Sequence, residues 1–109
     1  MDIQRIGIVG AGVIGASWAA FYLSKGFDVV ATDPAPEADT RLRDALAEFL
    51  GDDAATLSSR LTFDADLSSA LRGVDFVQEN GPERLELKRA LYRQMDDLLP
   101  EHVPIASSS

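Results

Sequence analysis

Hydrophobic and polar positions along the chain form two kinds of pattern, short apolar runs and longer apolar stripes with helical spacing. The apolar runs predict five short strands, at residues 6–9, 27–32, 61–63, 74–78 and 103–106. The helical stripes predict helices over residues 13–24, 37–50 and 66–71, and from 82 or 83 to 99. Strands that alternate with helices are typical of a parallel sheet with right-handed crossovers. The expected fold class is therefore α/β, with a doubly wound parallel sheet.

A glycine-rich turn joins the first predicted strand to the first predicted helix. It reads Gly10-Ala11-Gly12-Val13-Ile14-Gly15, and between a buried strand and a helix this spacing indicates a dinucleotide-binding site of the Rossmann type. Gly10 suits the tight turn, Gly12 lets a pyrophosphate approach the backbone, and Gly15 lets the helix pack closely on the strand. The N–H groups at the start of the helix then face the phosphates. We expect all six residues to contact the cofactor.

One acidic residue, Asp33, ends the second predicted strand, about 20 residues beyond the glycines. A carboxylate at this place accepts hydrogen bonds from the ribose hydroxyls of an adenosine and repels a 2′-phosphate. Because no arginine follows before Arg41, NAD is favoured over NADP. The alternative is that Asp33 with Pro34 only starts a turn or caps the next helix.

Composition and charge exclude several other classes of protein. The 109 residues suffice for one domain, and a formal net charge of −8 argues against binding nucleic acid or an anionic membrane. Without cysteine the chain has no disulfide and no cysteine-based metal site, which fits a cytoplasmic protein; no metal site is predicted. Residues 6–24 are uncharged, but their glycines would weaken a membrane-spanning helix, so a buried strand and helix explain them better.

Four features of the sequence together resemble the NAD-binding domain of the 3-hydroxyacyl-CoA dehydrogenase family. They are the glycine turn, Asp33, the block from Pro82 to Lys88, and the closing segment from Ile105 to Ser109, and the resemblance covers the whole chain. It implies that Glu83 and Lys88 lie beside the nicotinamide half of NAD. The alternative is that Glu83 only favours the start of a helix and that Lys88 lies on the surface.

The chain also departs from the family members that act on acyl-CoA, which carry a long helical hairpin between the second helix and the third strand. Residues 51–60 are too few for that hairpin. This favours the branch that resembles lambda-crystallin/L-gulonate 3-dehydrogenase and L-carnitine dehydrogenase, which handle small polar 3-hydroxy acids. The resemblance further implies oxidation of a 3-hydroxy acid to the 3-oxo compound and a homodimer of the full-length protein.

The resemblance places the family's catalytic residues outside this sequence. Its active-site serine and histidine–glutamate pair would follow Ser109, ahead of a helical domain that residues 1–109 do not include, so no catalytic residue is predicted here. The only histidine, His102, is expected in an exposed loop. Two alternatives stay open: the FAD-binding half of a flavoprotein oxidase, in which the Glu83–Lys88 block has no counterpart, and a stand-alone nucleotide-sensing module, which needs no catalytic pair.

Overall fold

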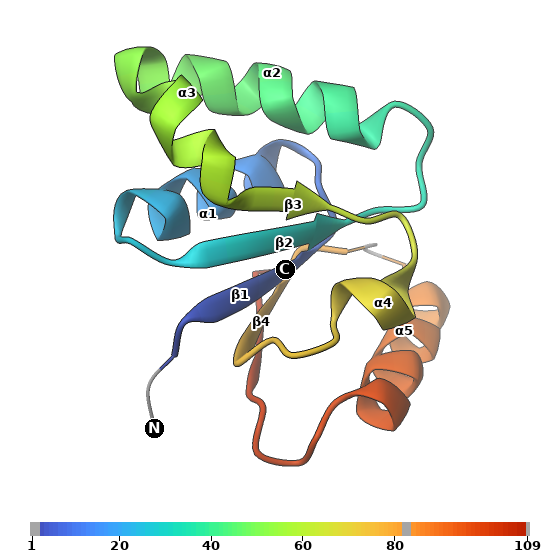
Figure 1. The fold of residues 1–109 in the computed structure, drawn as a ribbon. Helices are drawn as coiled ribbons and strands as arrows, with labels where there is room; N and C mark the ends of the chain where they lie inside the picture. The colour runs from blue at the N-terminus through green and yellow to red at the C-terminus, as the bar shows by residue number, and fades with distance from the viewer. Residues whose placement is uncertain (1–2, 82–83, 109) are drawn as a thin grey trace.

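The computed structural model describes residues 3–81 and 84–108 and contains one parallel sheet (Figure 1). Its strand order is β3-β2-β1-β4-β5, and all four neighbouring pairs are parallel. The strands are β1 (Arg5–Val9), β2 (Asp28–Thr32), β3 (Leu61–Phe63), β4 (Phe76–Glu79) and β5 (Ile105–Ser107). The order reverses between β1 and β4, as in a doubly wound sheet.

Helices cover both faces of the sheet. The longer ones are α1 (Val13–Ser24), α2 (Ala38–Leu50) and α5 (Leu85–Leu98), and a short one is α4 (Leu67–Ala70). In Figure 1, α1, α2 and the short α3 (Ala54–Leu57) lie on one side of the sheet and α4 and α5 on the other. The predicted α/β, Rossmann-type fold is confirmed.

Side chains on alternate positions of the strands form two separate cores. Ile6, Ile8 and Val29 pack with α1 and α2, whereas Val30 and Val77 pack with α4 and α5. Successive residues of a strand point to opposite faces, and here both faces are covered. This double coverage explains why the strands appear in the sequence as uninterrupted apolar runs.

Most predicted boundaries agree with the structure within two residues, and the differences have local causes. Val74 lies outside β4 because its N–H donates to the Leu71 carbonyl at 3.4 Å, in a turn. Val103 lies outside β5 because its N–H donates to the Pro100 carbonyl at 3.1 Å. The predicted start of the last helix, at Pro82 or Glu83, falls outside the described residues.

Two other segments have a form that the sequence left open. Residues 51–60 form three short helical turns, η1 (Gly51–Asp53), α3 (Ala54–Leu57) and η2 (Ser58–Arg60). The uncharged stretch 6–24 is divided among β1, the glycine turn and α1. In the described part of the chain no helix combines the length and apolarity that a membrane crossing needs.

Candidate functional site

A cleft of about 690 Å³ opens at the carboxyl ends of β1, β2 and β4. One wall is formed by Val9, Gly10, Gly12, Thr32, Asp33 and Pro34, with Asn80 and Gly81 beside them. The other wall comes from the start of α4 and from α5, through Ala65, Leu67, Leu87, Ala90, Leu91 and Gln94. The cleft therefore lies at the reversal of strand order, where open α/β sheets bind their ligands.

The three glycines of the turn differ in what surrounds them. Gly10 has a φ of +98°, and a Cβ there would lie 2.9 Å from the backbone of Asn80. A Cβ on Gly15 would lie 1.9 Å from the carbonyl oxygen of Gly10. A Cβ on Gly12 would meet nothing within 4 Å. Packing within the protein thus explains glycine at positions 10 and 15, whereas no steric contact among the described residues requires glycine at position 12.

The first turn of α1 faces the same space without a side-chain cap. Gly12 occupies the N-cap position, where it offers no side chain to accept hydrogen bonds from the helix N–H groups. Val13 and Ile14, which follow it, are 76% and 57% exposed. An uncapped helix N-terminus beside an open backbone position is suited to an anionic group such as a pyrophosphate.

Asp33 joins the glycine turn to the segment after β2. One carboxylate oxygen accepts a hydrogen bond from the Ala11 N–H at 2.8 Å, and the other accepts one from the Ala35 N–H at 2.9 Å. The second bond is the turn that the sequence offered as an alternative, but Asp33 does not cap α2, whose N-cap is Glu37. The carboxylate is half-buried and also lines the cleft.

Lys88 lies at the carboxyl ends of β4 and β5. Its Nζ is 3.4 Å from a carboxylate oxygen of Glu79 and 3.5 Å from the Ser107 hydroxyl. The Lys88 side chain is only 20% exposed, which disagrees with the alternative of an ordinary surface lysine. Glu83, predicted to act with it, lies outside the described residues.

One residue that contacts Lys88, Tyr92 and Ser107 was not predicted from the sequence. Glu79 ends β4 and is fully buried, and it accepts hydrogen bonds from the Ser107 hydroxyl at 2.9 Å and the Tyr92 hydroxyl at 3.1 Å. Burial raises the pKa of the Tyr92 hydroxyl, so this group stays protonated and donates. The available signal was the polar run Gln78-Glu79-Asn80 directly after an apolar strand, at the edge where parallel strands end.

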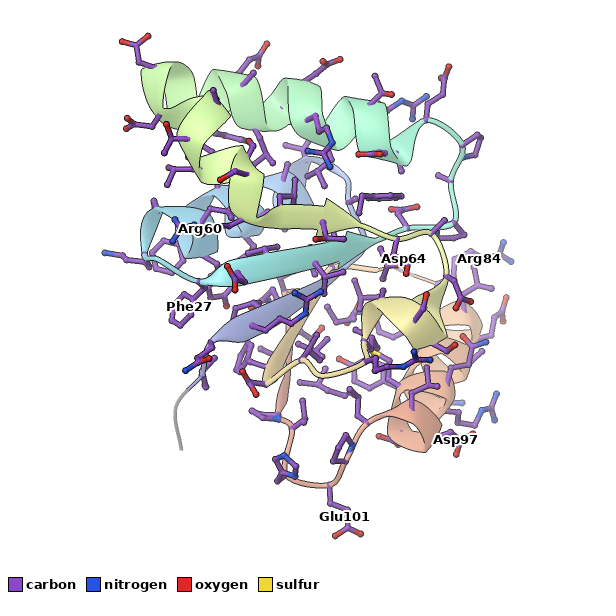
Figure 2. All side chains as sticks on the ribbon, in the orientation of Figure 1. Phe27, Arg60, Asp64, Arg84, Asp97 and Glu101 are labelled. Carbon is purple, nitrogen blue, oxygen red and sulfur yellow. The ribbon has the colours of Figure 1, made fainter. Side chains whose placement is uncertain are left out.

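His102 is exposed, in the turn between α5 and β5, as expected. It lies away from the cleft, close enough to Asp75 next to the start of β4 to make a small contribution to lowering the Asp75 pKa. Figure 2 shows its neighbour Glu101 at the bottom of the view, well below Asp64 and Arg84 at the right. Within residues 3–81 and 84–108, no three histidine or carboxylate side chains gather in a way that could hold a metal ion.

A doubly wound sheet with a glycine turn that opens onto a cleft at its switch point defines a dinucleotide-binding domain. The chain belongs to the 3-hydroxyacyl-CoA dehydrogenase family: residues 5–109 match the family described as the 3-hydroxyacyl-CoA dehydrogenase NAD binding domain. The resemblance stated from the sequence is thus confirmed. NAD, the predicted cofactor, is the one that this family description prints, and the flavoprotein alternative loses its support.

Individual relatives agree with this assignment. The chain is 44% identical to an L-carnitine dehydrogenase of Streptomyces griseus, covering 99% of this chain and 34% of that protein. It is 41% identical to a 3-hydroxyacyl-CoA dehydrogenase of Gibberella moniliformis, covering 99% and 35%. A crystal structure of 3-hydroxybutyryl-CoA dehydrogenase from Escherichia coli superimposes with a TM-score of 0.91 at 27% identity, covering 100% of this chain and 25% of that one. The chain spans about a third of the length of the curated relatives it matches.

Proposed function

We propose that this chain is the NAD-binding part of a dehydrogenase that oxidises a small polar 3-hydroxy acid to the 3-oxo acid. The observation that carries the proposal is the open space at Gly12, beside an uncapped helix N-terminus and the carboxylate of Asp33. No packing requirement explains glycine there, whereas a bound pyrophosphate does. The relatives named above are dehydrogenases, which supports the same class of reaction.

Residues of this chain would hold the two halves of the cofactor differently. Gly10–Gly15 and the start of α1 would bind the pyrophosphate through backbone N–H groups. Asp33 would accept hydrogen bonds from the adenosine ribose, and the apolar wall of Ala65, Leu67, Leu87 and Leu91 suits an adenine ring. Lys88, together with the predicted Glu83, would lie beside the nicotinamide half. When bound, NAD supplies the ring carbon that accepts a hydride.

The substrate class is argued from the connection between α2 and β3. Residues 51–60 all belong to three short helical turns, which connect the end of α2 directly to the start of β3. They leave no room for the helical hairpin that acyl-CoA-specific members carry at this place. The proposal therefore names an acid of the carnitine or gulonate kind. It also keeps the expectations of a homodimer and of a cytoplasmic location.

The experiment uses the protein as its gene encodes it, with NAD and a panel of L-carnitine, L-gulonate and 3-hydroxybutyryl-CoA. We expect NADH to form with one of the two free acids and more slowly, by at least about tenfold in kcat/KM, with the thioester. Preference for the thioester would overturn the proposed substrate class. Failure of the protein to bind NAD at all would overturn the proposal as a whole.

A further inference from the structure

Glu79 is the only fully buried charged side chain among residues 3–81 and 84–108. Burying an ionised carboxylate is costly unless charged and hydrogen-bonding partners surround it. Both of its oxygens have such partners: Lys88, Tyr92 and Ser107 contact one oxygen, and the backbone N–H of Gly81 donates to the other. This donor set suits the ionised form, so a negative charge is held at a fixed point beneath the end of the sheet.

The buried charge lies under the half of the cleft that the adenosine does not use. Glu79 pairs in register with Val9 of β1 and Ser107 of β5, and the next two residues, Asn80 and Gly81, line the cleft. Because Asp33 on β2 marks the adenosine side, a dinucleotide that crosses the switch point places its other half over β4 and β5. Glu79 and Lys88 are thus neighbours of the nicotinamide half.

The two oxidation states of the cofactor differ by one charge at that place. The nicotinamide ring of NAD⁺ carries a formal positive charge, and the ring of NADH carries none. An ammonium group near the ring therefore disfavours NAD⁺ relative to NADH, and a carboxylate near it does the reverse. In a partly buried site such effects stay large because water screens them poorly.

We propose that Glu79 is a positioning residue that sets the preference of the site between NAD⁺ and NADH. It holds the Lys88 ammonium in place at 3.4 Å, and its negative charge offsets that ammonium beneath the ring, so that NAD⁺ is accepted. Tyr92 and Ser107 keep the carboxylate in position and contribute no charge. This inference rests on the proposed function, because it assumes that the cleft binds NAD.

The test compares the dissociation constants of NAD⁺, NADH and ADP-ribose in the protein as its gene encodes it. Glu79→Gln removes one negative charge from beneath the ring and leaves the Lys88 ammonium without its counter-charge there. We therefore expect the ratio of the NAD⁺ to the NADH dissociation constant to rise by about five- to thirtyfold. The affinity for ADP-ribose, which lacks the nicotinamide, should stay within about twofold of the wild-type value. Adding Lys88→Met to Glu79→Gln removes both charges and should restore the wild-type ratio.

Tyr92→Phe is the matched control, because it removes one hydrogen bond to the same carboxylate and changes no charge. In this variant the ratio of the NAD⁺ to the NADH dissociation constant should equal that of the wild type. An unchanged ratio in a folded Glu79→Gln protein, or an equal shift in Tyr92→Phe, would overturn the inference. If Glu79→Gln does not fold, Lys88→Met alone decides. The ratio of the NAD⁺ to the NADH dissociation constant should fall in this variant, because it lacks the ammonium group near the ring, and an unchanged ratio overturns the inference.

If the wild-type protein binds neither NAD⁺ nor NADH, the proposed function has failed. If the wild type binds both and only the variants disagree with expectation, the role of Glu79 has failed and the proposed function stands. The two failures are thus distinguishable in one set of measurements.

Discussion

Gly12 and Gly15 stand three positions apart in one turn, and they are glycine for different physical reasons. At Gly15 the protein itself leaves no room, since a Cβ would lie 1.9 Å from a backbone oxygen. At Gly12 the folded chain leaves the space empty. A motif that is uniform in the sequence therefore combines one glycine that packing within the protein requires with one that no contact in the folded chain requires.

This difference predicts opposite results for two identical substitutions. Gly12→Val should cost about 1 kcal/mol or less of folding free energy, because the side chain enters open space, and should abolish NAD binding. Gly15→Val should cost at least roughly 1–3 kcal/mol, because α1 must move away from the glycine turn. Urea denaturation and NAD titration of both variants check the pair. Retained NAD affinity in Gly12→Val would contradict the placement of the pyrophosphate.

Asp33 supplies a second prediction at this scale. Asp33→Ala should weaken NAD binding by about 1–3 kcal/mol and reduce the preference for NAD over NADP. The structure adds that the carboxylate also accepts a bond from Ala11, so part of this loss comes from a less ordered glycine turn. Asp33→Asn is the control, because it retains an acceptor and removes the charge. Equal NAD and NADP affinities in the wild-type protein would contradict the role of Asp33.

Among the elements, β1 and β4 are held together at their starts by one side chain. The Asp75 carboxylate accepts hydrogen bonds from the N–H groups of Gln4 at 2.9 Å and Arg5 at 3.0 Å. These two bonds hold the pKa of Asp75 below its ordinary value, with a smaller contribution from His102. Asp66 behaves similarly at the start of α4, where the Ser69 N–H lowers its pKa.

A lowered pKa in the folded state has a defined effect on stability. Folding favours the ionised form of Asp75, so its contribution is complete above its unfolded pKa, about 3.9, and is lost as the pH falls through the lower folded value. We expect Asp75→Asn to lose less stability than the wild type between about pH 5 and pH 2. Urea midpoints at several pH values measure this, with the exposed Asp97→Asn as control. Parallel acid profiles of wild type and Asp75→Asn would show that these bonds do not act this way.

How far the sequence predicts each element depends on whether its signal is local. The helix predicted over residues 66–71 forms as α4, and the Asp66 carboxylate at its start accepts the Ser69 N–H at 3.0 Å; such a cap needs only neighbours in the chain. Glu79 was missed because its partners Tyr92 and Ser107 come 13 and 28 positions later, on different elements. Nothing near Glu79 in the sequence distinguishes a buried, paired carboxylate from one exposed at a strand end.

For the whole molecule, the sheet separates the cleft from the only histidine. The cleft lies at the carboxyl ends of the strands, and His102 lies in a turn near Asp75, beside the strand starts. Oxidation of an alcohol requires a base close to the hydroxyl group that loses its proton. The described part of this chain places no histidine there.

A prediction about activity follows from this separation. Residues 1–109 produced alone should bind NAD and oxidise none of carnitine, gulonate or 3-hydroxybutyryl-CoA. Incubation with NAD and each substrate, with NADH absorbance as the readout, checks this. Turnover that disappears in His102→Ala would identify His102 as the base, against our interpretation; turnover that persists in that variant would place a base elsewhere in these residues.

The chemical character of the cleft walls also bears on how binding responds to ionic strength. Of the described residues that line the cleft, Asp33 alone carries a charge. The phosphates would therefore be held by the partial charges of peptide N–H groups, which reach only a few ångströms. Added salt weakens attraction between formal charges over longer distances. We expect NAD affinity to stay level or rise slightly as salt increases, and a steep fall in affinity would reveal cations that reach the phosphates from outside the cleft.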